Sequence, residues 1–259
     1  MVDQISQLIL DGLRALARPD KIAVYAGFFK SGPGEYGEGD RFLGVTVPDQ
    51  KKLATQFVQK ARLADLQCLL DSEFHECRAV ALQILVTRFA KTKVAEEQAP
   101  LVALYEANFA RVNNWDLVDM SAPKLTGPWY ASRDRAALFF WARSPDLWTR
   151  RIAIMSTFAF IREGDFATSL ELADILLLDR QDLIQKATGW MLREIGNRAG
   201  QVERNWLAAF PSAMDTGPGT RTDLPRYQQM GRTMLRYAIE KFPKPEYQEW
   251  LNGTIPGHP

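Results

Sequence analysis

The feature that most constrains this chain is a succession of amphipathic helical patterns with no strand pattern between them. From Val47 onward, apolar residues recur at helical spacing in one segment after another, and alternating β-branched runs are lacking. Ala, Leu, Gln, Lys, Arg and Glu dominate, which favours helices. The chain is therefore predicted to be all-α, with degenerate helical repeats stacked on one another. The expected helices, joined by short connectors, cover residues 21–30, 48–61, 63–70, 74–91, 94–111, 131–143 and 183–197, with a further one after Pro145.

Bulk properties limit the class of protein. The 259 residues are 46% hydrophobic, which is enough to bury a sizeable core as one large or two small domains, and we predict a single domain over 1–259. A net charge of +1 excludes a globally basic nucleic-acid binder. Any affinity for DNA must therefore come from a local arrangement of Lys and Arg.

Targeting and metal signals are weak. Residues 1–17 carry an acid and a helical apolar period, which predicts a helix and not a signal peptide, and no apolar run reaches the ~18 residues of a membrane span. We expect a soluble, cytoplasmic protein. Cys68 and Cys77 suit a reducing compartment, although a disulfide between them is an open alternative. With only His75 and His258 beside them, a zinc site has too few ligands, so neither a metal nor a cofactor is expected.

The first candidate site lies in residues 113–123. Trp115 and Asp119 are four residues apart, so a helix that starts after Asn113 or Asn114 places the indole and the carboxylate on one face. One of these two asparagines is expected to be the N-cap. The alternative is that Trp115 is a core aromatic and Asp119 a solvated or capping acid.

The second candidate is the predicted helix 183–197. One face carries Lys186, Trp190, Arg193 and Asn197, and an opposite face is apolar. A tryptophan flanked by two cations and an amide is not a core pattern. It indicates a surface for a flat or apolar partner that carries negative charge, of which nucleic acid is the commonest.

A glycine-rich segment at 31–44 contains a G-x-G-x-x-G spacing at Gly32, Gly34 and Gly37. A dinucleotide site needs a strand before this pattern and a helix after it, whereas this loop follows a predicted helix and carries three acids that would repel phosphate. The glycines are therefore interpreted as turn residues.

Four stretches together resemble one known family, the AlkD-type DNA alkylation repair enzymes. They read FFKSGPGEYGEGDRFLGV, NNWDLVD, IQKATGWMLRE and RTMLRYAIEKF, and they occur in the family's order within residues 8–242. Members of this family are DNA glycosylases built from HEAT-like repeats. The resemblance therefore implies a curved right-handed solenoid with a concave DNA-binding face, acting as a monomer on double-stranded DNA that contains alkylated purines.

The resemblance also implies roles for individual residues. Asp119 would stabilise the oxocarbenium-like sugar and position a water, with Trp115 and Trp190 as walls around the lesion sugar. The DNA backbone would be held by Arg151, Lys186 and Arg193. Arg150 and Arg151 lie in the first turns of a helix, where cations oppose the dipole, so a compensating partner is expected. The alternative is that both are solvated surface arginines.

A single carboxylate in the site limits the reactions that the protein can catalyse. No nucleophile–histidine pair and no second acid are placed beside Asp119 by the sequence. A purine alkylated at N3 or N7 is already cationic, so it leaves as a neutral base and needs no proton donor. The expected activity is therefore metal-independent hydrolysis of the N-glycosidic bond, which the family performs without base flipping. The rival interpretation is a non-enzymatic helical-repeat module that binds DNA structures or a protein.

The C-terminal part departs from the family pattern. Residues 211–225 are rich in Gly, Pro, Thr and Asp and are interpreted as an inserted loop, and Gly231 stands where relatives have a proline. Cations outnumber acids over 221–244, which is either a phosphate-binding rim or a solvated face. The tail 253–259 is expected to fray.

Overall fold

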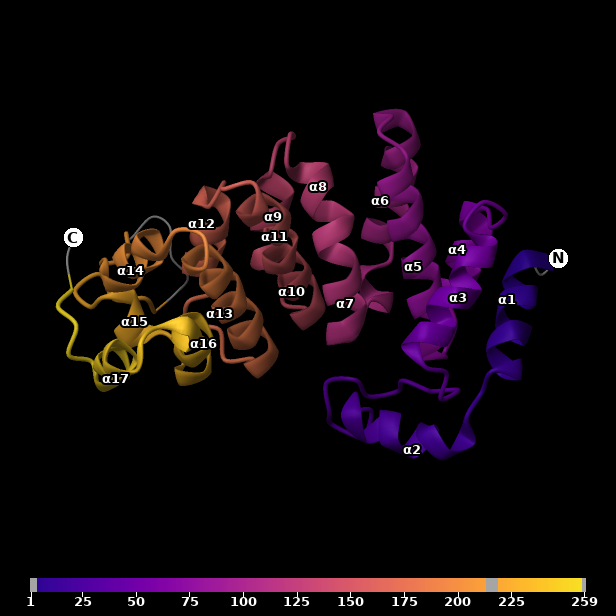
Figure 1. Cartoon of the computed structure of the whole chain (residues 1–259), viewed down its shortest axis with the longest axis horizontal. Helices are drawn as coiled ribbons and strands as arrows, with labels where there is room; N and C mark the ends of the chain where they lie inside the picture. The colour runs from indigo at the N-terminus through magenta and orange to yellow at the C-terminus, as the bar shows by residue number, and fades with distance from the viewer. Residues whose placement is uncertain (1–3, 213–218, 258–259) are drawn as a thin grey trace. The chain divides into compact units, whose positions relative to one another are not determined.

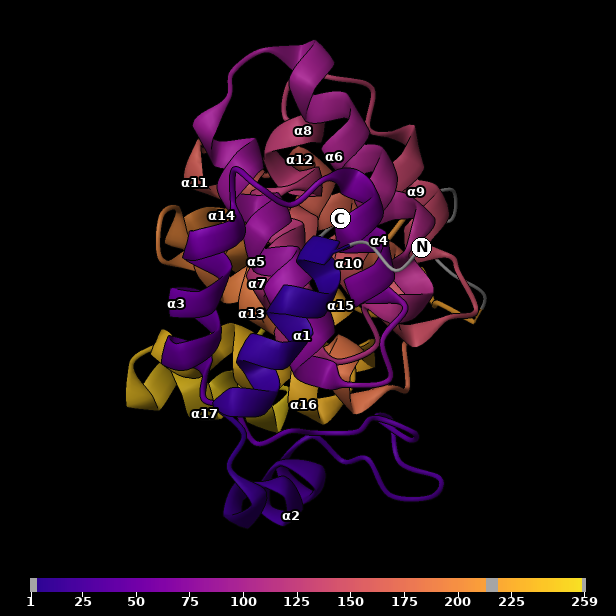
Figure 2. The ribbon, with the colours of Figure 1, turned by 90° about the vertical axis from the view of Figure 1, so that its right-hand side faces the viewer.

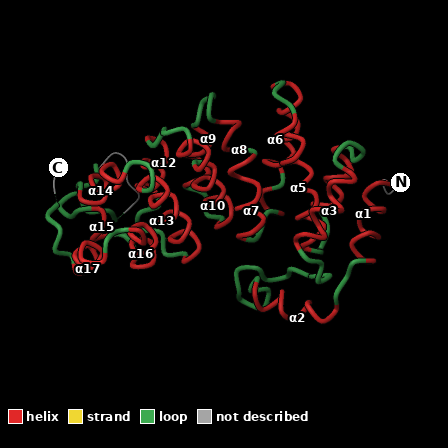
Figure 3. Tube along the Cα trace, viewed as in Figure 1, coloured by secondary structure: helices red, strands yellow, loops and turns green. Residues whose placement is uncertain are grey.

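The computed structural model describes residues 4–212 and 219–257, in which helices are joined by loops and no strand occurs (Figure 3). An isolated bridge pairs Arg41 with Phe74. The all-α prediction is thus confirmed. The chain divides into two compact units, Met1–Leu125 and Thr126–Pro259. HEAT-like repeats, curvature, handedness and a single domain over 1–259 remain predictions.

Unit 1 is organised around one long buried helix, α5, which packs against α1, α3, α4, α6 and α7 (Figure 1). Over residues 75–85 every side chain of α5 is buried, because helices cover it on several sides. Its ends suit the helix dipole, with Glu76 in the first turn and Arg88 and Lys91 in the last. The elements of unit 1 are α1 (Gln4–Ala15), α2 (Pro19–Phe28), α3 (Val47–Phe57), α4 (Leu63–Leu70), α5 (His75–Lys91), α6 (Ala95–Ala107), η1 (Phe109–Arg111), α7 (Trp115–Ser121) and η2 (Ala122–Lys124).

Helix α2 differs from the other α-helices of unit 1 because it has no buried residue. In two views at right angles, α2 and the loop that follows it lie at one end of the unit, beside α1, α3 and α5 (Figures 1 and 2). Val24 and Phe28 are 65% and 59% exposed, so this apolar helix is attached to the unit by few side chains.

Unit 2 is organised around α13, which packs against α10, α11, α12, α14 and α16. Gly189 permits the close crossing of α13 and α16, since a Cβ at this position would lie 2.6 Å from the Cβ of Tyr237. The elements of unit 2 are α8 (Thr126–Tyr130), α9 (Ala136–Ala142), α10 (Leu147–Ser156), α11 (Phe158–Arg162), α12 (Ala167–Ile175), α13 (Asp182–Gly196), α14 (Gly200–Ala208), α15 (Arg226–Gln229), α16 (Arg232–Ala238), η3 (Ile239–Lys241) and α17 (Lys244–Asn252).

The segment interpreted as an insertion connects α14 with α15. Its described residues, 211–212 and 219–225, are not helical, and 213–218 lie outside the described residues. The chain after it is anchored by Arg226, which donates to both carboxylate oxygens of Asp174 on α12 at 2.5 and 3.1 Å. In the tail, Tyr227 donates to the Ile255 carbonyl at 2.6 Å, and residues 258–259 are outside the described range.

Candidate functional site

A pocket of about 670 Å³ in unit 1 brings Trp115 and Asp119 together. Four α-helices and the 3-10 helix η2 supply its walls, and both polar and apolar side chains line it. Lys51 of α3 and Lys124 of η2 add positive charge to the lining. The other lining residues are Phe28 and Phe29 from α2 and its C-cap, Val47, Ala54 and Thr55 from α3, Gln83, Val86 and Thr87 from α5, and Asp116 and Met120 from α7.

Asn114 starts α7 and fixes its position. Its side-chain oxygen accepts from the Trp115 amide at 2.9 Å, so Asn114 is the N-cap. Its side-chain nitrogen donates to the Phe29 carbonyl at 3.2 Å, which ties α7 to the end of α2. Gly37 of the glycine-rich loop packs on this group, since a Cβ there would lie 2.9 Å from Asn114 Nδ2. The predicted helix start is therefore confirmed, and the glycine serves close packing.

Trp115 forms an aromatic wall of the pocket and is not a fully buried core residue. Its ring lies 5.6 Å from that of Phe28 in an edge-to-face contact and 5.7 Å from that of Phe29. Asp119, one turn later, is also partly exposed and lines the same pocket. The i, i+4 pair thus presents an indole and a carboxylate to one space.

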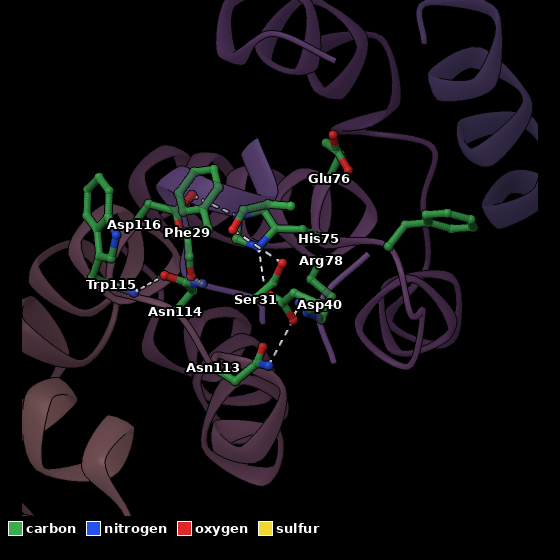
Figure 4. Close-up of polar contacts among 12 residues, drawn as sticks. Phe29, Ser31, Asp40, His75, Glu76, Arg78, Asn113, Asn114, Trp115 and Asp116 are labelled. Carbon is green, nitrogen blue, oxygen red and sulfur yellow. Dashed lines mark hydrogen bonds and ion pairs between the residues drawn. The ribbon is translucent and has the colours of Figure 1, made fainter. Parts of the chain in front are cut away.

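Behind this pocket lies a buried charged network that the sequence analysis missed (Figure 4). His75, the first residue of α5, contacts Asp40 through Nδ1 and Asp116 through Nε2, both at 2.9 Å. Asp40 also accepts from Arg78 at 2.5 Å and from Asn113 at 3.0 Å. Asp116 lines the pocket, so a second acid stands near Asp119, contrary to expectation.

The two carboxylates determine the charge of His75. Burial alone would lower the pKa of His75, but the charge of Asp116 and the hydrogen bonds to both carboxylates outweigh it and raise the pKa to about 9. His75 is therefore an imidazolium at neutral pH. For Asp40, burial favours the neutral acid, but the bond to His75 and the charge of Arg78 lower its pKa below the usual value.

The next residue of α5, Glu76, holds the loop that leads to α3. It is 1% exposed, and its carboxylate accepts from the backbone amides of Leu43, Gly44 and Val45 at 2.8 to 3.2 Å. The first turn of α5 thus fixes both the loop and α7. A sequence signal existed, because residues 75–78 read HECR directly before the apolar run AVAL of the same helix.

The other predicted DNA contacts lie in unit 2. Lys186, Trp190 and Arg193 are partly exposed along one side of α13, whereas Ala187, Met191 and Ile195 are buried, so the predicted amphipathic helix is confirmed.

The polar groups of Lys186, Trp190 and Arg193 have partners in the chain. Lys186 pairs with Asp182 at 2.6 Å, Trp190 Nε1 donates to Glu194 at 3.2 Å, and Arg193 pairs with Glu240. Their contacts to DNA remain predictions.

Arg151 is placed differently from these residues. It is 4% exposed, and its guanidinium donates to the Leu183 carbonyl in the first turn of α13. A phosphate contact by Arg151 is therefore the predicted role that the geometry supports least. Its neighbour Arg150 has the expected compensating partner, Asp179, at 2.7 Å.

Over residues 4–212 and 219–257, no three His, Cys, Asp or Glu side chains converge as metal ligands. Cys68 and Cys77 are not joined in a disulfide. No described helix is both long and apolar enough to cross a bilayer.

Comparison with known proteins identifies the family. A sequence model described as DNA alkylation repair enzyme matches residues 9–242. A search of curated proteins found no match. Among solved structures, the chain is similar to a "Predicted DNA alkylation repair enzyme from Enterococcus faecalis", with a TM-score of 0.65 and 16% identity over 88% of this chain and 97% of that one. At this identity the likeness supports the fold alone.

Proposed function

We propose that this chain, which belongs to the family of DNA alkylation repair enzymes, is a DNA glycosylase. Its substrates would be cationic purines alkylated at N3 or N7, such as N3-methyladenine and N7-methylguanine in duplex DNA. It would hydrolyse their N-glycosidic bond in base excision repair, without metal or cofactor and without flipping the base.

The observation that carries this proposal is the shared pocket of Trp115 and Asp119. A cationic base leaves with the bonding electron pair and becomes neutral, so positive charge develops on the sugar. Asp119 is suited to stabilise that charge and to orient the water that adds to C1′ and releases a proton. The Trp115 ring adds a cation–π contact to the developing cation, a contribution of about 0.5–2 kcal/mol.

The pocket of unit 1 is suited to recognise the charge of the lesion and its phosphates more than the shape of the base. Phe28 and Trp115 offer aromatic faces, and Lys51 and Lys124 offer charge for neighbouring phosphates. We further propose that α13 binds the duplex through Lys186 and Arg193 near phosphates and Trp190 near a sugar. Each cation would have to exchange its present acidic partner for a phosphate.

Arg151 is the least favoured phosphate contact because of its burial, and we expect it to hold the start of α13 instead. We propose that the protein acts as a monomer in the cytoplasm. Two cysteines without a disulfide suit that compartment.

The test is release of free base from duplex DNA carrying N7-methylguanine or N3-methyladenine at high enzyme concentration, without added metal. Asp119→Asn should lose most excision and keep DNA binding, because only the charge of the side chain is removed. The matched control is Asp20→Asn, an exposed acid in the first turn of α2, which should excise as the wild type does.

Normal excision by Asp119→Asn would remove Asp119 from the mechanism. If neither protein releases base while both bind DNA, the non-enzymatic binding module becomes the better description. That outcome would also make the pocket a recognition site.

A further inference from the structure

His75 joins two walls of the pocket through different kinds of contact. On the α7 side, Nε2 bonds to Asp116, which is flanked by Trp115 in sequence and lies three residues before Asp119. On the α2 side, the imidazole stacks on Phe29 with ring centroids 4.7 Å apart and an interplanar angle of 28°. Phe29 in turn lies 5.7 Å from the ring of Trp115.

The loop after α2 provides the third attachment. Asp40 bonds to Nδ1 of His75, and Phe42 lies 5.2 Å from the imidazole and stacks on Phe29 at 5.5 Å. Since α2 has no buried residue, these contacts link it to α7 together with the bond from Asn114 to the Phe29 carbonyl and the rings of Phe28 and Phe29 against Trp115. A 2% exposed imidazole thus lies where α2, its loop, α5 and α7 meet.

We propose that His75 is a positioning residue for the proposed glycosylase site, and that its imidazolium form sets how the α2 and α7 walls hold Trp115 and Asp119. This inference rests on the proposed function only for its consequence in catalysis. The coupling of His75 to Trp115 is a property of the fold and can be measured without substrate.

The charge of His75 matters because both of its polar contacts are carboxylates. An imidazolium donates from both nitrogens, so it satisfies Asp40 and Asp116 at once. A neutral imidazole carries one N–H and would leave one carboxylate facing a ring lone pair. The charged groups facing the ring are Asp40 from the loop and Asp116 from α7, with Arg78 of its own helix behind Asp40; α2 contributes the uncharged Phe29.

The same contacts make Asp116 unsuitable as a proton donor or acceptor in the reaction. Its Oδ2 is engaged by the imidazole, and its Oδ1 is buried with no hydrogen-bond partner. A carboxylate held in this way is a fixed point of attachment for the first turn of α7. Asp119 is therefore left as the pocket carboxylate for the chemistry.

The first experiment follows the indole N–H of Trp115 by NMR, assigned with Trp115→Phe, together with the ring signals of His75, from pH 6 to 10. The expected result is one shared titration with a midpoint near 9, the raised pKa of His75. In His75→Gln, the step in the Trp115 signal should disappear. The proposal is overturned if the Trp115 signal does not change as His75 titrates, or if the same step in the Trp115 signal is still seen in His75→Gln.

The second experiment compares single-turnover excision by the wild type, His75→Gln and Asn108→Ala. Asn108 is a buried polar residue of the same unit that bonds to Gln67 away from the pocket, so its variant reports the effect of a lost buried hydrogen bond. We expect His75→Gln to slow excision by about tenfold to a hundredfold, as for a misplaced catalytic group, with DNA affinity kept. Folded Asn108→Ala should excise the base at the wild-type rate.

Equal rates for folded His75→Gln and the wild type would refute positioning. If the wild type releases no base, the proposed function fails, and the NMR titration still decides whether His75 controls Trp115. If His75→Gln does not fold, the pH profile of wild-type excision decides: a loss of rate as pH rises through about 9 supports the proposal, and a flat profile overturns it.

Discussion

Replacement of Glu203 by Gln should stabilise unit 2 at neutral pH. Glu203 on α14 is 1% exposed, and its Oε1 has no hydrogen-bond partner. Burial raises the pKa of this carboxyl to about 8, against the lowering effect of Arg204 and Arg193. The native state therefore favours the protonated acid, whereas the unfolded chain releases the proton near its ordinary pKa of 4.5.

The sign and size of the stabilisation by Glu203→Gln follow from proton linkage. The native state binds more protons than the unfolded state between pH 4.5 and 8, so stability falls as pH rises across this window. At about 1.4 kcal/mol per pH unit, the cost of Glu203 at pH 7 is on the order of 3 kcal/mol. A glutamine has nearly the same shape and does not titrate. The unfolding free energy of Glu203→Gln relative to that of the wild type should therefore increase as pH rises and level off above pH 8.

The assay is urea denaturation at several pH values between 4 and 9, with hydrogen exchange of the α14 amides as a measure of unit 2 alone. The quantity to plot is the difference in unfolding free energy between variant and wild type, because the titration of His75 in unit 1 then cancels. Glu163→Gln, which changes an exposed acid of unit 2, is the control and should give a flat difference. A flat difference for Glu203→Gln as well would refute the argument.

Four further substitutions test three other contacts. Asn114→Ala removes the N-cap of α7, so it should cost about 1–2 kcal/mol in urea denaturation, and a loss below a few tenths would mean that the cap is dispensable. Arg226→Ala removes both bonds to the buried Asp174 carboxylate, so it should cost about 3–5 kcal/mol and lower Tm by at least ~6 °C, whereas an unchanged Tm would contradict a structural ion pair. Lys186→Ala should weaken DNA binding and reduce the salt slope by about one, and Asp182→Asn, which removes the negative charge paired with Lys186, should strengthen binding; equal slopes for wild type and Lys186→Ala would place Lys186 off the DNA.

Local spacing in the sequence was enough to predict the fold class and part of the site. The helix start before Trp115 and its pairing with Asp119 were predictable because caps and i, i+4 neighbours depend on a few adjacent residues. The exposed side of α13 was predictable for the same reason.

Contacts between distant segments could not be predicted in this way. His75 reaches Asp40 and Asp116, which are 35 and 41 residues away in the sequence, and helical periodicity carries no information on such pairs. In the sequence, His75 stands near two cysteines and therefore suggests only a zinc ligand. Similarly, the position of Arg151 in a first helical turn does not reveal that its guanidinium turns inward to the Leu183 carbonyl.

The short length of α7 explains why these distant contacts matter for the site. A seven-residue helix is too short to be stable by itself, so its orientation comes from what holds it. Asn114 fixes its start, His75 holds Asp116 in its first turn, and Tyr105 of α6 bonds to Ser121 at its end at 2.8 Å. These attachments come from α2, α5 and α6. The direction in which α7 presents its indole and carboxylate therefore depends on side chains that never face the pocket, and substitutions at those positions should affect the pocket as strongly as changes within it.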